Sequence, residues 1–236
     1  MSESAGFATY HKIHSVFKRD QRGRFMLGEY SRPEIEYLAN SEWLWTEKVD
    51  GTNIRIGIDA DNVFRIGGRT DRAQIPVRLL DAIAELDLER KIRDHFGGNG
   101  GDPQEQPEEA GPITVTLYGE GYGAKIQKGG GNYRQDQGFV LFDVNVSGWW
   151  LRRGSVEDVA QALGLDVVPV VHEGTIASAI DIVGTPEGQK SSWGMFRAEG
   201  LVGTPAVPLF ARDGSRVVVK VKSKDFDRLR REGLWA

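Results

Sequence analysis

Four residues that could support nucleophilic chemistry lie within six positions of one another. Lys48 is followed by Asp50, Gly51 and Asn53 in the run Lys-Val-Asp-Gly-Thr-Asn. A lysine amine that loses its proton is a nucleophile, and a glycine beside it lets another backbone or a ligand come close. The competing interpretation is structural, with an ordinary Asp-Gly turn and Lys48 as its solvated flank. The rest of the chain must decide between the two interpretations.

Two apolar, partly alternating runs surround these residues. They occupy positions 43–48 and 54–58, and their junction at Asp-Gly predicts a β-hairpin with Lys48 at the end of its first strand. Upstream, Pro33 fits the first turn of a short helix over residues 33–40. The lysine is therefore expected to be held by a sheet.

The remaining chain shows more strand patterns than helix patterns. Further strands are predicted at residues 63–67, 113–120, 139–146, 167–171, 199–203 and 217–222. Helical spacing of apolar residues predicts one or two helices over 76–96, and further helices over 155–163 and 175–183. Because strands outnumber helices, the predicted fold class is α+β with largely antiparallel sheets.

Several of these strands deliver polar or aromatic residues near their ends. Glu120 ends one strand, and Phe142 and Asp143 lie in the next. Lys220 and Lys222 are two residues apart on the last strand, so their side chains share one face. The structural alternatives are a core position for Phe142 and a solvated face for the two lysines.

Basic residues gather in two segments although the net charge of the chain is −4. Residues 11–32 mix cations with aromatics, which suits a phosphate-rich ligand but equally suits an exposed edge hairpin. Residues 121–138 are glycine-rich but lack the Gly-Lys-Ser/Thr ending of a P-loop. The candidate RNA-binding cations are Lys18, Arg19, Arg22, Arg24, Lys125, Lys128 and Arg134.

Composition narrows the class of protein. The 236 residues are 39% hydrophobic with six Trp, enough to bury a core, and we expect a single domain over residues 1–236. The absence of cysteine excludes disulfides and thiolate metal sites and fits a cytoplasmic location. No signal peptide or bilayer-spanning run is visible, so no membrane partner is expected. Residues 97–111 are expected to form a mobile, dispensable surface loop.

Five short motifs in one order resemble the nucleotidyltransferase motifs of polynucleotide ligases. They are Lys48 to Asn53, Gly68-Arg69-Thr70, Phe142-Asp143, Glu199 to Val202, and Lys220-Val221-Lys222. Asn53 and the Tyr-Gly-Glu at 118–120 look like the ATP-dependent RNA ligase branch typified by the second RNA ligase of phage T4. The resemblance covers residues 11 to 226. It implies a covalent nucleotidyltransferase fold, similar to ATP-grasp proteins, in which two antiparallel sheets flanked by helices hold a nucleotide.

This resemblance also implies a reaction. Lys48 would attack the α-phosphorus of ATP to form lysyl-AMP, and AMP would then pass to an RNA 5′-phosphate. A 3′-hydroxyl would displace AMP and seal the two RNA ends or a nicked duplex. Lys220 and Lys222 would hold the phosphates, and Glu199 and Asp143 would hold Mg²⁺ or Mn²⁺.

The resemblance further implies a nucleotide pocket. Glu120 would accept hydrogen bonds from ribose hydroxyls, and Phe142 would stack on adenine. Glu47 with Lys48 would begin the adenine pocket, while Asn53 and Arg69 would serve the reactive phosphate and the RNA 5′-phosphate. The cations of the two basic segments would guide the RNA strand.

One departure from the family pattern leaves alternatives open. The sequence ends ten residues after Phe226, so we expect no C-terminal OB-fold, and a partner subunit could supply a missing domain. The alternative function is a nucleotidyltransferase fold that binds nucleotide or RNA, or transfers AMP to another acceptor, without sealing strands. A relative that uses NAD or GTP is a third option.

Overall fold

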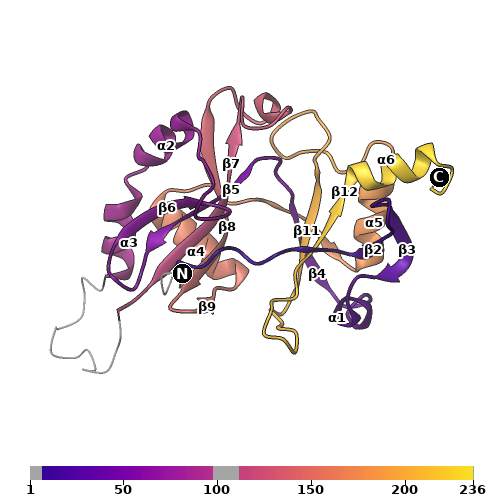
Figure 1. The fold of residues 1–236 in the computed structure, drawn as a ribbon, viewed down its shortest axis with the longest axis horizontal. Helices are drawn as coiled ribbons and strands as arrows, with labels where there is room; N and C mark the ends of the chain where they lie inside the picture. The colour runs from indigo at the N-terminus through magenta and orange to yellow at the C-terminus, as the bar shows by residue number, and fades with distance from the viewer. Residues whose placement is uncertain (1–6, 98–111, 236) are drawn as a thin grey trace. The chain divides into compact units, whose positions relative to one another are not determined.

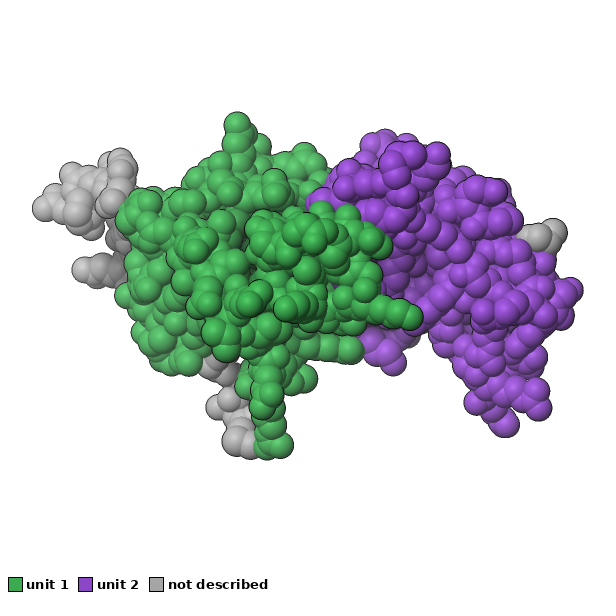
Figure 2. Space-filling model, turned by 90° about the horizontal axis from the view of Figure 1, so that it is seen from above, with its two compact units in different colours: residues 1–10, 51–167 green, residues 11–50, 168–236 purple. Residues whose placement is uncertain are grey.

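The computed structural model describes residues 7–97 and 112–235. The chain folds into two compact units (Figure 2). Unit 1 comprises residues 1–10 and 51–167, and unit 2 comprises residues 11–50 and 168–236. Nearly all of the loop expected at 97–111 lies outside the described residues. Whether the two units act as the single domain expected from the sequence remains a prediction.

Unit 1 is built on a five-stranded antiparallel sheet with the order β6-β5-β7-β8-β9 (Figure 1). Its strands are β5 (Thr52–Ile58), β6 (Phe64–Gly68), β7 (Val115–Gly123), β8 (Gln137–Val146) and β9 (Trp149–Trp150). Its helices are α2 (Val77–Ala84), α3 (Leu88–Phe96), α4 (Arg153–Leu163) and the 3-10 turn η1 (Gly130–Asn132). Alternate apolar residues such as Ile54, Leu117 and Leu141 pack against these three α-helices. Along each strand, the residues that alternate with these apolar residues therefore point to the opposite face of the sheet.

Unit 2 is built on a second five-stranded sheet with the order β1-β12-β11-β4-β10. Its strands are β1 (His14–Ser15), β4 (Trp43–Glu47), β10 (Val170–Gly174), β11 (Gly200–Pro205) and β12 (Val219–Lys222). All neighbours are antiparallel except β1 and β12. A separate hairpin, β2 (Phe17–Arg19) and β3 (Phe25–Tyr30), and the helices α1 (Pro33–Tyr37), α5 (Ile176–Gly184) and α6 (Ser223–Arg231) complete the unit. The predicted α+β class with largely antiparallel sheets is confirmed.

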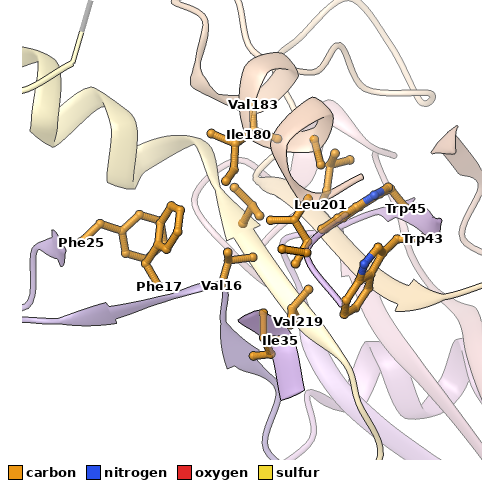
Figure 3. Packing of buried hydrophobic residues seen from close by; sticks show 14 of the residues in the cluster. Val16, Phe17, Phe25, Ile35, Trp43, Trp45, Ile180, Val183, Leu201 and Val219 are labelled. Carbon is orange, nitrogen blue, oxygen red and sulfur yellow. The ribbon is translucent and has the colours of Figure 1, made fainter. Parts of the chain in front are cut away.

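The core of unit 2 includes two tryptophans of β4 (Figure 3). Trp43 and Trp45 are fully buried and stacked, with ring centroids 5.8 Å apart. Their indole N–H groups donate to the backbone oxygens of Leu38 and Gly174, at 2.9 and 3.1 Å. Buried indoles need such partners. Because every second residue of β4 enters this core, the strand that precedes Lys48 is held firmly.

The predicted hairpin around Asp50 and Gly51 is wrong. β4 pairs with β10 and β11, whereas β5 pairs with β6 and β7. The Asp-Gly pair therefore joins the two units. A Cβ on Gly51 would lie 2.2 Å from the backbone oxygen of Gly121. Glycine is therefore needed here because the backbone approaches β7 closely. This requirement gives the same Asp-Gly pair as a hairpin turn, which is why the hairpin was predicted.

Other differences concern boundaries and one missed helix. β10 begins three residues later than the strand predicted at 167–171, and α1 ends at Tyr37. Helix α6 was not predicted because its sequence is mostly charged and only Phe226 and Leu229 give it an apolar side. None of the helices within residues 7–97 and 112–235 has the length and apolar character needed to cross a bilayer.

Candidate active site

Lys48 lies where the last residues of β4 and β12 meet the first residue of the strand between them, β11. β4 pairs with β11, and β11 pairs with β12 so that Gly200 faces Lys222. The backbone N–H of Lys48 donates to the oxygen of Gly200 at 2.9 Å, and this bond continues the ladder past the end of β4. Glu199 immediately precedes Gly200. The sheet therefore brings Lys48, Glu199 and Lys222 together at one end of β4, β11 and β12, although Lys48 and Glu199 are 151 residues apart in sequence.

One carboxylate joins the two lysine side chains. Lys48 Nζ donates to Glu199 Oε2 at 2.6 Å, and Lys222 Nζ donates to Glu199 Oε1 at 2.5 Å. The three side chains are only 16 to 20% exposed. A partly buried lysine with a short, charge-assisted hydrogen bond is not a solvated flanking residue. The structure thus excludes the interpretation of Lys48 as the solvated flank of an ordinary turn.

The charges of this cluster act on its two acids in opposite ways. Burial raises the pKa of Glu199, but the attraction and hydrogen bonds of Lys48 and Lys222 outweigh burial and hold this pKa below its ordinary value. Burial raises the pKa of Asp50, the negative charge of Glu199 adds to the rise, and the nearby lysines oppose it. Glu199 is therefore the ionised partner of the two lysines.

The residue that follows Glu199 must be a glycine because the backbone there leaves no room for a side chain. The φ of Gly200 is +155°, and a Cβ there would lie 2.0 Å from the backbone oxygen of Val221. Any side chain would push β11 away from β12. Since the pairing of these strands places Lys222 beside Glu199, the glycine maintains the cluster.

The other two predicted residues of this region lie differently. Lys220 faces Val202 across the β11–β12 pair, two residues before Lys222 and on the same side of β12. Glu47 has the same orientation as Trp45 and is 1% exposed, so its side chain points to the face opposite Lys48. Its place in a nucleotide pocket remains a prediction.

In unit 1, two predicted residues are direct cross-strand neighbours. Asn53 of β5 faces Glu120 of β7, and both point away from the helix-covered face because Ile54 points toward it. Among the described residues, Asn53 Oδ1 has no hydrogen-bond partner although the atom is buried. Arg69 is exposed and follows β6 directly. Asn53 and Glu120 thus present polar groups side by side.

Phe142 occupies a β-bulge. The register of β7 and β8 shifts so that Tyr118 faces Asp143 and Gly119 faces Leu141, which leaves Phe142 as the extra residue. Its half-buried ring packs edge-on against Tyr10 with centroids 5.1 Å apart. The Tyr10 hydroxyl donates to Asp143 Oδ2 at 2.8 Å. The bulge turns Phe142 out of the helix-covered core.

The described residues contain no group of three His, Cys, Asp or Glu side chains that could surround a metal ion. The predicted metal ligands Glu199 and Asp143 belong to different units. Glu199 offers the carboxylate oxygens that Mg²⁺ prefers, and Mg²⁺ commonly keeps several waters and takes only one or two carboxylates. A single carboxylate therefore fits a water-rich Mg²⁺ site, and a metal role for either residue stays a prediction.

A family model described as RNA ligase matches residues 41–222 of this chain. The matched region contains all three members of the Lys48 cluster. The chain belongs to the RNA ligase family. A comparison with curated proteins gives no match.

Solved structures of an RNA ligase from Naegleria gruberi share the fold. A variant with ATP and Mn superimposes with a TM-score of 0.64 at 17% identity, covering 96% of this chain and 59% of that one. Another variant with AMP and Mn gives 0.64 at 17% identity, covering 95% and 58%. The protein with PPi gives 0.61 at 18% identity, covering 95% and 64%. This RNA ligase family member spans less than two thirds of the length of those chains.

The predicted RNA-binding cations divide into two kinds. Arg19 donates to both oxygens of Asp225 at 2.9 and 2.8 Å, and Arg24 is paired with Asp20. Arg134 is likewise paired with Asp136, and Lys18 contacts Glu29 at 3.6 Å. The exposed cations with no acidic partner among the described residues are Arg22, Lys125 and Lys128. These three are the best placed for phosphate, and RNA binding by any of the seven remains a prediction.

Sequence reasoning missed two residues that shape the site. Asp50 belongs to the Lys48 motif but was given no role, although it lies in the field of Glu199 and the lysines. Tyr10 lies outside the region that matches the family, and only its neighbouring basic segment drew attention. No local pattern could have paired Tyr10 with Asp143, 133 residues away.

Phe142→Ala is expected to fold normally and to bind ATP more weakly. Its ring lies outside the helix-packed core, and base stacking is worth roughly 1–3 kcal/mol by alanine substitution. Phe139→Ala is the matched control, because Phe139 is 4% exposed in that core and should lose roughly 3–5 kcal/mol of stability. Thermal melting and ATP titration separate the two effects. If Phe142→Ala melts as early as Phe139→Ala, Phe142 is a packing residue and the stacking role is wrong.

Proposed function

We propose that this chain is the adenylation part of an ATP-dependent RNA ligase that joins 3′-hydroxyl and 5′-phosphate ends through lysyl-AMP and RNA-adenylate. The observation that carries the proposal is the partly buried contact of Lys48 with Glu199, shared with Lys222. A protein that only binds RNA has no need of a held amine. The structures of Naegleria gruberi RNA ligase that contain ATP support ATP as the substrate.

The proposed first step forms a bond between Lys48 Nζ and the α-phosphorus of ATP and breaks the bond to pyrophosphate. Lys48 must lose a proton to solvent before it attacks, because an ammonium has no free electron pair. Lys222 and Lys220 place positive charge where the phosphates would lie and would stabilise the transition state electrostatically. A bound Mg²⁺ or Mn²⁺, held through Glu199, would add charge that favours the neutral amine.

The residues of unit 1 are proposed to recognise the nucleotide and the RNA end. Glu120 has carboxylate oxygens for ribose hydroxyls, and Asn53 carries a buried amide oxygen that lacks a donor among the described residues. Phe142, released from the core by the bulge, offers a ring for adenine. Arg69 is exposed beside β6 and would contact a phosphate.

A second candidate is AMP transfer from Lys48 to an acceptor without strand sealing. The chain spans only 54 to 64% of the solved RNA ligase chains that it matches, so sealing is not assigned to these residues alone. A partner subunit or further chain would then complete RNA binding.

The deciding experiment separates the steps of the proposed reaction. Purified protein is incubated with Mg²⁺ and labelled ATP or GTP, and then with a 5′-phosphorylated RNA that has a 3′-hydroxyl. Label should enter the protein from ATP and pass to RNA-adenylate and then to a sealed product. Label that stays on the protein or moves to another acceptor would favour the second candidate, and no protein label at all would refute both.

A further inference from the structure

A buried carboxylate beside Lys48 makes a contact that the reaction above does not use. The Glu47 side chain is 1% exposed, and its Oε2 accepts a hydrogen bond of 2.7 Å from the backbone N–H of Ser192. Its Oε1 is also buried and has no partner among the described residues. Ser192 N–H is thus the one donor that the described part of the chain gives to this carboxylate.

Ser192 lies near the tip of a short hairpin, residues 189–198. The N–H of Ser191 donates to the oxygen of Phe196 at 2.8 Å, and that of Ala198 donates to the oxygen of Gln189 at 2.9 Å. Lys190 and Arg197 form a β-bridge between these two bonds. The residue that directly follows this hairpin is Glu199. The hairpin therefore leads directly into the carboxylate that holds Lys48.

The contact between Glu47 and Ser192 should be hard to break. A carboxylate removed from water is costly unless it is hydrogen-bonded, and this one has a single donor within the described residues. Strand β4 is itself held by its buried tryptophans, so the Ser192 contact fixes the hairpin against a rigid strand.

Glu47 and Lys48 are adjacent residues that point to opposite faces. Through Glu47 the strand end holds the hairpin that precedes Glu199, and through Lys48 it contacts Glu199 itself. Both partners of the Lys48–Glu199 pair are thus fastened to the same end of β4. A small shift of the hairpin would move Glu199 away from the amine.

We propose that Glu47 is a positioning residue, which sets Glu199 against Lys48 through the N–H of Ser192. The inference rests on the proposed function, since its expected effect is on lysyl-AMP formation. A direct contact of the Glu47 carboxylate with the nucleotide is the competing role. Positioning affects the rate of the chemical step, whereas a nucleotide contact made equally in substrate and transition state affects ATP affinity.

Ser192→Pro tests the proposal because proline has no N–H. Ser192→Ala is the matched control, since it keeps the N–H and changes only an exposed side chain. In single-turnover labelling, Ser192→Pro should lower the maximal rate about 10- to 100-fold, the order expected when a reacting group is misplaced by about 1 Å. The half-saturating ATP concentration should stay within about threefold, and Ser192→Ala should match the wild type.

Either of two results with the Ser192 variants would overturn the inference. Equal maximal rates for Ser192→Pro and Ser192→Ala would show that the N–H is not needed. A change confined to ATP affinity would assign Glu47 to the nucleotide. If Ser192→Pro does not fold by thermal melting, Glu47→Gln and Glu47→Ala replace it, because glutamine retains an acceptor for Ser192. Equal impairment of those two variants would mean that charge matters and anchoring does not.

Hydrogen exchange separates this inference from the proposed function. The amides of residues 189–198 should exchange faster in Glu47→Ala than in the wild type, and Glu47→Gln should resemble the wild type. Wild-type protein that forms no lysyl-AMP would refute the proposed function without affecting this result. Unchanged exchange in Glu47→Ala would refute the anchor whatever the activity.

Discussion

Lys48→Ala is expected to leave no detectable lysyl-AMP when the protein is incubated with labelled ATP and Mg²⁺. The variant lacks the amine that would bond to the α-phosphorus, and no other group replaces a covalent nucleophile. The label on wild-type protein should survive alkali and be released by hot acid, because protonation of the nitrogen breaks the P–N bond of a lysine phosphoramidate, and peptide mapping at neutral or alkaline pH should place it on residue 48. A denaturing gel is sufficient for the comparison.

Lys48→Arg provides a sharper form of the same experiment. Arginine can keep the ion pair with Glu199, so the variant should fold, but its guanidinium stays protonated and cannot attack. Lys12→Ala is the matched control, because Lys12 is an exposed lysine of unit 2 that has no part in the Lys48 cluster. It should label like the wild type. Labelling of Lys48→Ala or Lys48→Arg at the wild-type level would place the nucleophile elsewhere.

Local patterns predicted most elements because each pattern reports one local cause. The apolar, partly alternating run at residues 43–48 indicated a strand, and β4 is a half-buried strand at this place. The helical spacing over residues 76–96 predicted α2 and α3. Thr175 was expected to start a helix, and its hydroxyl caps α5 by accepting from the N–H of Ser178. These features depend on neighbours within a few positions.

The pairing of strands could not be read in the same way. An Asp-Gly pair between two apolar runs favours a hairpin when the runs pair with each other. Here β4 and β5 each find partners far along the chain, in separate sheets. Which strands pair depends on which apolar faces can be buried together, and local sequence does not contain that information.

The candidate site shows the same division. The motifs indicated Lys48, Glu199 and Lys222 as a group, and the sheet brings them together. The bulge that frees Phe142 and the burial of Glu47 required the register of whole strands. Counting cations also failed to show that Arg19 is already neutralised by Asp225. Charge in a segment predicts a basic surface only where no acid folds back onto it.

Glu199→Gln is expected to slow lysyl-AMP formation by ~10²- to 10³-fold, the usual cost of removing one positioned electrostatic partner. Glutamine keeps the shape of the side chain but cannot offer two charged oxygens to Lys48 and Lys222. Glu187→Gln makes the same chemical change at an exposed position of unit 2 and should leave the rate unchanged. A Glu199→Gln rate equal to that of Glu187→Gln would show that the carboxylate is not part of the reaction.

The same variant should change how stability depends on pH. The two lysines hold the pKa of Glu199 below its ordinary value of 4.5 despite burial. An acid with a lowered pKa in the folded state adds stability above its unfolded pKa, and that stability is lost as pH falls through the folded pKa. Denaturant unfolding should therefore show wild type more stable than Glu199→Gln at about pH 6, with the gap closing below about pH 4. Asp50 shifts the other way, and losing the negative charge of Glu199 relieves part of that shift in the variant. A gap that widens on acidification would mean that Glu199 is protonated in the folded protein and that the two lysines do not share an ionised partner.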